Sequence, residues 1–318
     1  MYLIRGQHNL ELFKEKFPGV ILHGTIGNFD GLHIGHQSIL HKIKTNAEKT
    51  NSKTIVFFTE PHASEYFANK QDFKFLPPPR ICSWREKFEL LRDFGIDFAF
   101  FLKFNNSLQT MTPEKFISDI LDNVGLCSFT VGDDFRFGIN REGDFELLQS
   151  WGNQNDIFVS NTDTLKIHNE RVSSTRIRQA LLNSDFSLAN ELLGRPYSFS
   201  GKVVHGQQLG RTIDVPTANI WMPSQKLPIS GVYAVECLLE DKFLKGIANM
   251  GIRPTVGGKK PVLEVHLFDF NEDIYSKRIQ VEFKYKIREE KKFKNLDMLK
   301  SQIQEDIKTA KIFLSKTI

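Results

Sequence analysis

The stretch Gly27-Asn28-Phe29-Asp30-Gly31-Leu32-His33-Ile34-Gly35-His36 decides how the first half of this chain folds. A short apolar run with β-branched residues precedes it, at 20–26, and apolar residues recur at helical spacing after it, from Ile34 to Ala47. The spacing predicts a strand, a glycine-containing loop and a helix, in that order. Because glycine has no side chain, Gly27 and Gly35 would let a ligand approach the backbone closely.

The two histidines of this loop predict a site for a phosphate-bearing ligand. The first N–H groups of a helix lack partners and carry the positive end of its dipole, so they attract anionic oxygen. His33 and His36 are neighbours on the helix, and each can donate a hydrogen bond to a phosphoryl group that gains charge under attack. The alternative is that both histidines are solvated or only cap the helix, because short motifs often occur by chance.

Composition and charge fit two folded domains in a reducing compartment. The chain has 318 residues, 40% of them hydrophobic, and its 28 Phe against 6 Tyr indicate an aromatic interior. A formal net charge of +4 is small for this length and disfavours a nucleic-acid partner. The cysteines, Cys82, Cys127 and Cys237, form no zinc pattern, so we expect packing residues in a cytoplasmic protein. No apolar run approaches the length of a membrane span, so no membrane partner is expected.

Short apolar runs alternate with helical patterns from residue 20 to about 183. Strands are predicted at 20–26, 54–58, 98–102, 128–131 and 157–159, and helices at 34–47, 84–94, 145–151 and 175–183. A further helix begins at Thr112-Pro113-Glu114, which offers an N-cap, a first-turn proline and an acid. This alternation predicts a doubly wound parallel sheet, whose ligands bind beyond the carboxyl ends of the strands. The histidine loop follows such an end.

The second half of the chain has a different pattern. After a helical stretch at 186–193, strands are predicted at 197–204, 231–239, 243–248, 262–270 and 279–285, joined by Gly, Pro, Asp and Asn turns. These strands predict a small antiparallel β-barrel. Apolar residues at helical spacing from Leu299 to Ala310 predict a C-terminal helix that covers it. We place the domain boundary near 184–195, which gives domains 1–184 and 185–318.

Other polar segments of the first half follow predicted strands or begin a helix. Ser173–Arg178 combines hydroxyls at a helix start with two arginines, which suits a triphosphate or an ordinary N-cap with solvated arginines. Val131–Gly138, which contains Asp134, either shapes a pocket for a ring system or forms a turn held by phenylalanines. His62 follows the second strand, and we expect it to be a surface residue.

The β region holds a second group of candidate site residues. A glycine-bearing loop at 206–212 can fold over phosphates, and the Thr217 hydroxyl and Asn219 amide oxygen can bind Mg²⁺ together with ATP. The alternative is a hairpin turn closed by local Thr and Asn hydrogen bonds. Glu264 lies between apolar residues of a predicted strand, where an unpaired carboxylate is costly. It therefore has a partner or a function, such as a base that accepts a proton from an alcohol.

All of these segments occur in one order across almost the whole chain, and in that order the sequence resembles the bacterial bifunctional riboflavin kinase and FAD synthetase family. The stretches that carry the resemblance are 27–36, 131–138, 173–178, 201–219, 246–255 and 263–270. Gly-Arg-Thr followed by Pro-Thr-Ala-Asn, with Asn249–Thr255 downstream, is highly specific for this family. His-x-Gly-His by itself indicates only the wider nucleotidyltransferase superfamily.

The resemblance implies that the β domain transfers the γ-phosphoryl group of Mg-ATP to riboflavin, which gives FMN. By the family pattern Thr217 and Asn219 hold the metal and the phosphates, and Glu264 is the base. The other nucleotide-binding positions implied in this domain are Gly201, Lys202, Gly210 and Arg211.

The resemblance also implies that the α/β domain, a nucleotidyltransferase-type sheet, adenylylates FMN with a second ATP, which gives FAD and pyrophosphate. His33 and His36 stabilise charge at the α-phosphorus, and no protein nucleophile is needed. Ser174, Thr175 and Arg178 hold the β- and γ-phosphates. The remaining binding positions implied here are Gly27, Asn28, Phe29, Asp30, Gly35 and Asp134.

The sequence departs from the family pattern in two places. Asp214-Val215 replaces Gly-Phe, and a carboxylate there would repel phosphate or reach the metal. Ala63 replaces the last proline of Pro-His-Pro, which would alter the flavin or adenine pocket slightly.

Two other functions compete with this interpretation. One is a nucleotidyltransferase for pantetheine phosphate or nicotinamide mononucleotide with a regulatory barrel, against which Thr217, Asn219 and Glu264 argue. The other is a nucleic-acid-binding protein with a basic C-terminal helix, which the modest charge disfavours. Only flavins and ATP are expected as partners, and the sequence leaves a monomer or a weak oligomer open.

Overall fold

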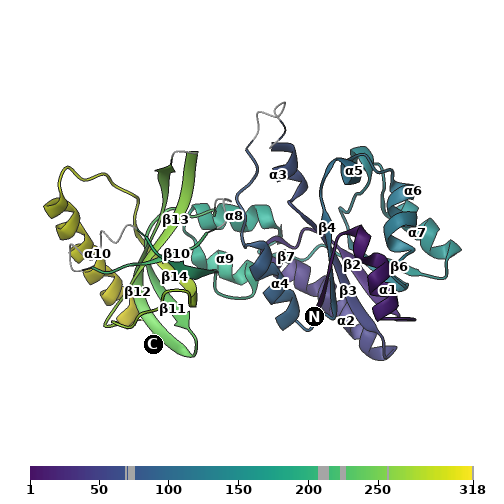
Figure 1. Ribbon diagram of the computed structural model, residues 1–318, viewed down its shortest axis with the longest axis horizontal. Coiled ribbons are helices and arrows are strands. Elements are labelled where there is room, and N and C mark those ends of the chain that lie inside the picture. Colours follow the sequence, from purple (N-terminus) through teal and green to yellow (C-terminus); the bar gives the residue numbers. More distant parts are fainter. Residues whose placement is uncertain (69, 71–75, 207–214, 223–226, 256–257, 317–318) are drawn as a thin grey trace. The chain divides into compact units, whose positions relative to one another are not determined.

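The computed structural model describes residues 1–68, 70, 76–206, 215–222, 227–255 and 258–316 (Figure 1). The chain forms two compact units. Unit 1 comprises Met1–Pro78 and Lys87–Ser173, and unit 2 comprises Pro79–Glu86 and Ser174–Ile318.

Unit 1 contains a six-stranded sheet with the order β1-β4-β3-β2-β5-β6. In chain order the strands are β1 (Tyr2–Arg5), β2 (Leu22–Ile26), β3 (Lys53–Glu60), β4 (Phe98–Lys103), β5 (Leu126–Gly132) and β6 (Phe158–Thr162). Every neighbouring pair is parallel, so the predicted parallel sheet is confirmed. The sequence did not predict β1, which is short and lies at the edge of the sheet.

Helices cover both faces of this sheet. Successive residues of each strand point to opposite faces, so adjacent residues of one strand pack against different helices. The helices are α1 (Leu10–Lys16), α2 (Ile34–Lys49), α3 (Ala63–Ala68), α4 (Trp84–Asp93), α5 (Asn106–Gln109), α6 (Pro113–Phe116) and α7 (Phe145–Gln154). Ile55 and Phe57 of β3 pack in a cluster that includes residues of α1, α6 and α7. Val56 and Phe58 pack in a second cluster with residues of α2 and α4. The sheet is therefore doubly wound, as predicted.

The strand order reverses direction at β2. From β2 the chain builds β3 and β4 on one side, and it then returns to place β5 and β6 on the other side. In such sheets the loops that leave the two central strands run in opposite directions and open a crevice at the carboxyl ends. The loops after β2 and β5 are the histidine loop and the segment that starts at Asp133.

Unit 2 contains a closed barrel with the order β10-β13-β12-β11-β14-β9. The strands are β9 (Ser198–Val204), β10 (Ala218–Ile220), β11 (Gly231–Leu239), β12 (Lys242–Thr255), β13 (Gly258–Leu267) and β14 (Arg278–Arg288), and neighbouring strands are antiparallel. This confirms the predicted barrel. Only β10 was not predicted, because three residues are too few to show a period. The unit also contains α8 (Ser174–Leu182) and α9 (Phe186–Leu193). By its contacts α8 belongs to unit 2, whereas the predicted domain boundary follows it.

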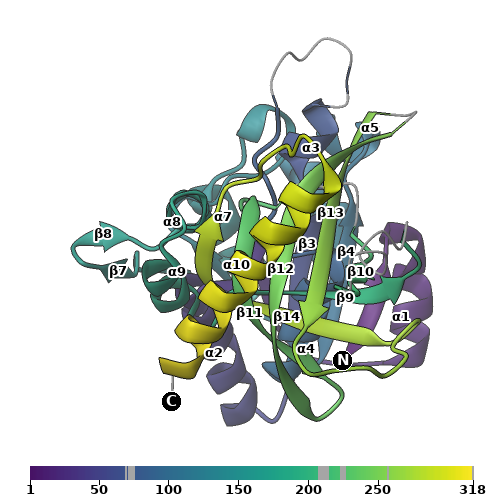
Figure 2. The same ribbon diagram turned by 90° about the vertical axis from the view of Figure 1, so that its left-hand side faces the viewer.

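The C-terminal helix α10 (Leu296–Lys316) lies across β11, β12 and β14, as predicted (Figure 2). Ala310 and Leu314 pack against apolar side chains of the barrel strands. A buried ion pair anchors the same helix: the Arg288 guanidinium donates hydrogen bonds of 2.6–3.0 Å to the Asp306 carboxylate. The helix is thus an integral part of the barrel unit.

Candidate active sites

The histidine loop reverses the chain between β2 and α2 through residues with left-handed backbone angles. Phe29, Gly31 and Leu32 have φ values of 48°, 75° and 42°. Such angles are strained for residues other than glycine and persist where the surrounding packing fixes them. Phe29 and Leu32 are both buried in the cluster with α2 and α4. Packing of these two side chains therefore holds the loop in the shape that begins α2.

His33 and His36 form a stacked pair at the start of α2. Their ring centroids lie 3.6 Å apart at an interplanar angle of 16°. His33 is the N-cap, and its Nδ1 accepts a hydrogen bond of 3.3 Å from the His36 backbone N–H. An Nδ1 that accepts leaves the proton of a neutral imidazole on Nε2. His33 caps the helix, as the alternative predicted, but it is 6% exposed and therefore not solvated.

The surroundings of His36 favour its neutral form. Burial lowers the pKa of His36 well below 6.5, and electrostatic interactions with His33 and Lys87 lower that pKa further. Its Nδ1 is buried and has no hydrogen-bond partner among the described residues. A neutral imidazole still donates through one N–H. The pair is therefore suited to donate hydrogen bonds to anionic oxygen at neutral pH.

The glycines of the loop make room for these rings. A Cβ atom at Gly35 would lie 3.2 Å from His33 Nδ1, and one at Gly27 would lie 3.2 Å from the Phe29 ring. Asp30 is 2% exposed, whereas Asn28 is exposed and its Oδ1 accepts a hydrogen bond of 3.3 Å from Thr59 Oγ1.

His62 and Lys87 add a second polar group to unit 1. The expectation that His62 is a surface residue is wrong, because its side chain is 6% exposed. It lies just before α3, and its Nε2 is 3.2 Å from the ammonium nitrogen of Lys87, which is completely buried. No role was predicted for Lys87 from the sequence. Its spacing from Trp84 and Leu91 places Lys87 on the apolar face of α4, and this spacing could have indicated from the sequence that Lys87 is buried.

The segment after β5 forms a turn held by aromatic side chains, which was one of the two alternatives. Phe135 and Phe137 stack with ring centroids 5.6 Å apart. Asp134 is exposed and forms an ion pair of 3.0 Å with Arg171, which also contacts Asp133 at 2.9 Å.

The hydroxyls and the arginine of the 173–178 segment lie on α8, in unit 2. Ser174 is half-buried, Thr175 is exposed, and Arg178 Nε donates a hydrogen bond of 2.7 Å to the Pro79 carbonyl oxygen. Ser174 directly follows the last residue of unit 1 in the chain.

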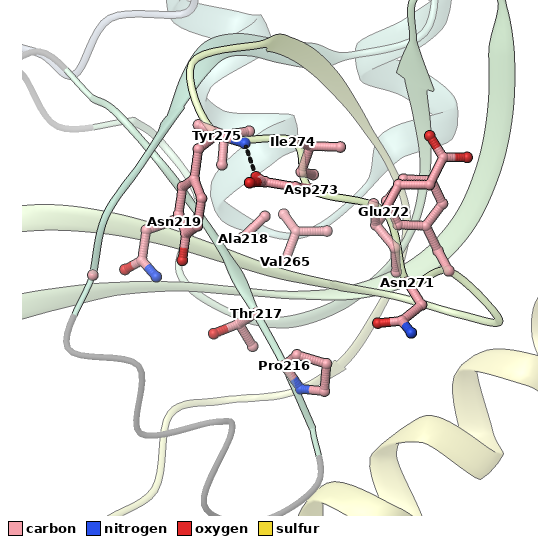
Figure 3. Close-up of a pocket in the computed structure, with 14 residues that line it drawn as sticks. Pro216, Thr217, Ala218, Asn219, Val265, Asn271, Glu272, Asp273, Ile274 and Tyr275 are labelled. Atoms are coloured by element: carbon pink, nitrogen blue, oxygen red, sulfur yellow. Dashed lines mark hydrogen bonds between the residues drawn. The ribbon is translucent and has the colours of Figure 1, made fainter.

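The barrel has a cavity of about 610 Å³ that contains two of the predicted ligand residues (Figure 3). It lies between β9, β10, β13 and the connection from β13 to β14, and its lining residues are Val203, Gly206, Pro216, Thr217, Ala218, Asn219, Val265, Leu267 and Phe270–Tyr275. Figure 3 shows Thr217 and Asn219 on one side of their segment, while Ala218 points toward Val265. Side chains that alternate in this way bring the hydroxyl and the amide together.

Glu264 lies in a polar row that crosses three strands. In the barrel register it is paired with Asn219 of β10 on one side and with Asn249 of β12 on the other. Directly opposite residues of antiparallel strands have Cβ atoms about 5 Å apart on the same face. Glu264 is half-buried, and its neighbours Leu263 and Val265 are buried on the opposite face. Asn249, to which the sequence assigned no role, is therefore a neighbour of Glu264 on the same face of the barrel wall.

Two glycines allow close contacts around this row. A Cβ at Gly206 would lie 2.2 Å from Nδ2 of Asn219, and one at Gly201 would lie 2.3 Å from Cγ2 of Ile220. Lys202 is exposed. Gly210, Arg211 and Asp214 lie outside the described residues.

The donor set of the barrel cavity suits magnesium bound to a nucleotide. Among the described residues there is no group of three His, Cys, Asp or Glu side chains that could hold a metal ion. The Thr217 hydroxyl and the Asn219 amide oxygen are neutral and hard, and Mg²⁺ bound to a nucleotide takes one or two protein ligands beside phosphate oxygens and water.

Comparisons with known proteins cover both units. The FAD synthetase family model matches residues 21–176, and the riboflavin kinase family model matches residues 193–314. The bifunctional riboflavin kinase/FMN adenylyltransferase of Escherichia coli K12 is 44% identical over 100% of this chain and 99% of its own length. The protein of the same name from Haemophilus influenzae is 42% identical over 99% of this chain and all of its own.

A solved structure has the same fold over most of its length. The crystal structure described as a macrolide-efflux protein from Streptococcus pneumoniae has a TM-score of 0.78 and 28% identity, and the match covers 96% of this chain and 97% of that one. In the described part of the present chain, none of the helices combines the length and apolar character needed to cross a membrane. The chain belongs to the bifunctional riboflavin kinase/FMN adenylyltransferase family, as its sequence predicted.

Proposed function

We propose that this chain phosphorylates riboflavin to FMN in its barrel and then adenylylates FMN to FAD in its α/β region. The observation that carries the proposal is that both family models match one chain in succession, each over a unit with its own polar site. The stacked His33–His36 pair lies in the first match, and the row of Asn219, Glu264 and Asn249 lies in the second. We assign residues 1–184 to adenylyl transfer and 185–318 to the kinase.

In the kinase step Glu264 accepts the proton of the terminal ribityl hydroxyl while that oxygen attacks the γ-phosphorus of ATP. The bond from the γ-phosphorus to its bridging oxygen breaks, and ADP leaves. Thr217 and Asn219 would hold a Mg²⁺ ion with the nucleotide, and that ion would supply positive charge for the transferred group. Asn219 and Asn249 are the cross-strand neighbours of Glu264, and in this proposal their amides position its carboxylate beside the substrate. Gly201, Lys202, Gly210 and Arg211 complete the nucleotide contacts of this proposal.

In the adenylyl-transfer step a phosphate oxygen of FMN attacks the α-phosphorus of a second ATP, and pyrophosphate leaves. The FMN phosphate is ionised at neutral pH, so no base is required and the protein contributes position and charge stabilisation. The Nε2–H of His33 and the N–H of His36 donate hydrogen bonds to the oxygens of the α-phosphate. Contacts to the nucleotide and flavin come from Gly27, Asn28, Phe29, Asp30, Gly35 and Asp134.

Ser174, Thr175 and Arg178 hold the β- and γ-phosphates in this proposal. Their place in the chain supports this: the start of α8 presents helix N–H groups, which favour anionic oxygen.

We propose Mg-ATP and flavins as the only partners, with no nucleic acid and no membrane surface. The free cysteines, two of them buried, fit the reducing conditions of the cytoplasm. The assembly is a monomer or a weak oligomer.

Two variants test the proposal by separating the activities. Glu264→Gln keeps the shape of the side chain but removes the base, so FMN formation from riboflavin is lost while FAD formation from supplied FMN continues. His36→Asn gives the opposite result. Each variant controls for the folding of the other unit, and the flavins are resolved by chromatography after incubation with Mg-ATP.

Mixing the two variants sharpens the test. FMN made by His36→Asn diffuses to Glu264→Gln, so the mixture forms FAD from riboflavin although neither variant does so alone. Loss of both activities from either substitution, in protein that remains folded, would contradict separate sites.

A further inference from the structure

Lys87 is a buried lysine of unit 1 that the proposed mechanism does not use. It lies on α4, its side chain is 0% exposed, and its Nζ is 5.0 Å from the centre of the buried Phe58 ring. Removing an ammonium group from water is costly unless its surroundings compensate it. A lysine in this position is therefore expected to serve a purpose that an apolar residue would not.

One partner of Lys87 is the ring of His62. Lys87 Nζ and His62 Nε2 lie 3.2 Å apart. Because an ammonium group can only donate, Nε2 accepts, and His62 is neutral with its proton on Nδ1. The backbone of His62 is also fixed, since its N–H donates a hydrogen bond of 3.1 Å to Glu65 Oε2. The contact therefore determines both the tautomer and the direction of this ring.

His62 and the stacked histidines follow neighbouring strands. β2 and β3 pair in parallel, with Ile26 opposite Phe57, so the loops that leave them begin at the same edge of the sheet. The loop after β2 leads to His33 and His36, and the chain after β3 leads to His62. Lys87 is close enough for its charge to lower the pKa of His36. The other titratable groups of these loops are Glu65 at the start of α3 and Asp30 in the turn before α2.

We propose that Lys87 is a positioning residue for adenylyl transfer, whose buried ammonium group holds the His62 ring and places a fixed positive charge behind the His33–His36 pair. This role rests on the proposed function of unit 1. When FMN attacks the α-phosphorus, negative charge builds on the phosphate oxygens, and a charge that is already oriented stabilises it without reorganisation. Burial favours the neutral form of His36 most, and the same charge favours it further, so that His36 stays in the form that stacks on His33 and donates one N–H.

The first test is Lys87→Met, which keeps the length of the side chain and removes the charge. We expect kcat for FAD formation from FMN to fall by about tenfold or more, while KM for ATP and FMN changes little, because the charge acts in the transition state. Lys87→Arg retains the charge and restores part of the rate. Riboflavin phosphorylation by the same sample is the control for folding of unit 2.

A pH profile separates this role from a purely structural one. Loss of the Lys87 charge raises the pKa of His36, so the acid limb of the FAD-forming activity moves to higher pH in Lys87→Met. The matched control is Lys44→Met, since Lys44 also lies over a phenylalanine ring, Phe94, and donates to the Phe94 carbonyl oxygen at 3.2 Å. We expect Lys44→Met to keep the wild-type pH profile of FAD formation.

His62 variants keep the inference testable if Lys87→Met folds poorly. His62→Gln retains an acceptor for the Lys87 ammonium group and keeps most of the rate of FAD formation. His62→Ala removes the acceptor and loses most of that rate. Wild-type kcat and an unshifted acid limb in Lys87→Met, or full activity in His62→Ala, would overturn the inference. Failure of the wild-type protein to make FAD from FMN would instead overturn the proposed function itself.

Discussion

Substitution of Gly206 by alanine tests the geometry of the kinase site. A Cβ at Gly206 would lie 2.2 Å from Nδ2, 2.4 Å from Cγ and 2.5 Å from Oδ1 of Asn219. Ordinary contacts begin at 3.4 Å, so the Asn219 amide must shift by about 1 Å. The φ angle of Gly206 is not in the left-handed region, so the backbone accepts alanine without strain. The substitution thus displaces one proposed ligand and leaves the fold intact.

The size of the effect follows from the displacement. A misplacement of about 1 Å in a reacting group costs on the order of a hundredfold in rate, which corresponds to about 2.7 kcal/mol of transition-state stabilisation. We therefore expect kcat for FMN formation to fall by about a hundredfold in Gly206→Ala. FAD formation from supplied FMN should be unchanged, because it uses the other unit.

A double-mutant cycle with Asn219→Ala shows whether the effect passes through Asn219. With alanine at 219 the amide that would clash is absent, so adding Gly206→Ala should cost little more. The assay is FMN formation from riboflavin and Mg-ATP under saturating substrate for the four proteins of the cycle. Wild-type activity in Gly206→Ala, or full additivity with Asn219→Ala, would refute the proposed geometry.

Two further predictions concern stability and pH. Asp306→Ala leaves the Arg288 guanidinium without its carboxylate beneath α10, so it should lower the free energy of unfolding of the barrel by about 3 kcal/mol, measured by urea denaturation. FAD formation from FMN at low temperature should persist in this variant. An unchanged urea midpoint would argue against a stabilising ion pair. For His36, burial holds the folded-state pKa below 6.5, so the unfolded chain binds a proton that the folded chain does not. The resulting stability is complete above pH 6.5 and is lost as the pH falls toward the folded-state pKa. FAD formation should therefore persist below pH 6.5, and His36→Asn should flatten the slope of stability against pH in that range; an acid limb centred at or above pH 6.5 would contradict the depressed pKa.

The sequence predicted elements whose periodicity is long and regular. The strands at 54–58 and 231–239 and the helix after His33 have clear apolar patterns, and the structure contains each of them. β1 and β10 are short, and their pairing depends on neighbours far away in the chain, so local patterns carried no signal for them. Fold class could be predicted, whereas the full number of strands could not.

The motifs of both sites could be predicted from the sequence, but the other residues that the fold brings next to them could not. His33, His36, Thr217 and Asn219 stood out because their residue types and loops suit phosphate chemistry. His62 and Lys87 did not, because their burial depends on α4 packing against β3, which only the tertiary structure provides. For Glu264 the apolar neighbours Leu263 and Val265 suggested a buried carboxylate. The barrel register instead places them on the opposite face from Glu264.

We propose that one chain carries out two successive reactions with ATP at two sites. Incubation of the wild-type protein with riboflavin, Mg²⁺ and ATP labelled at either the γ- or the α-phosphorus follows both transfers. We expect FAD that contains one phosphorus from a γ-position and one from an α-position, in equal amounts, with ADP and pyrophosphate as the other products. FAD without the γ-label, or no labelled flavin at all, would contradict it.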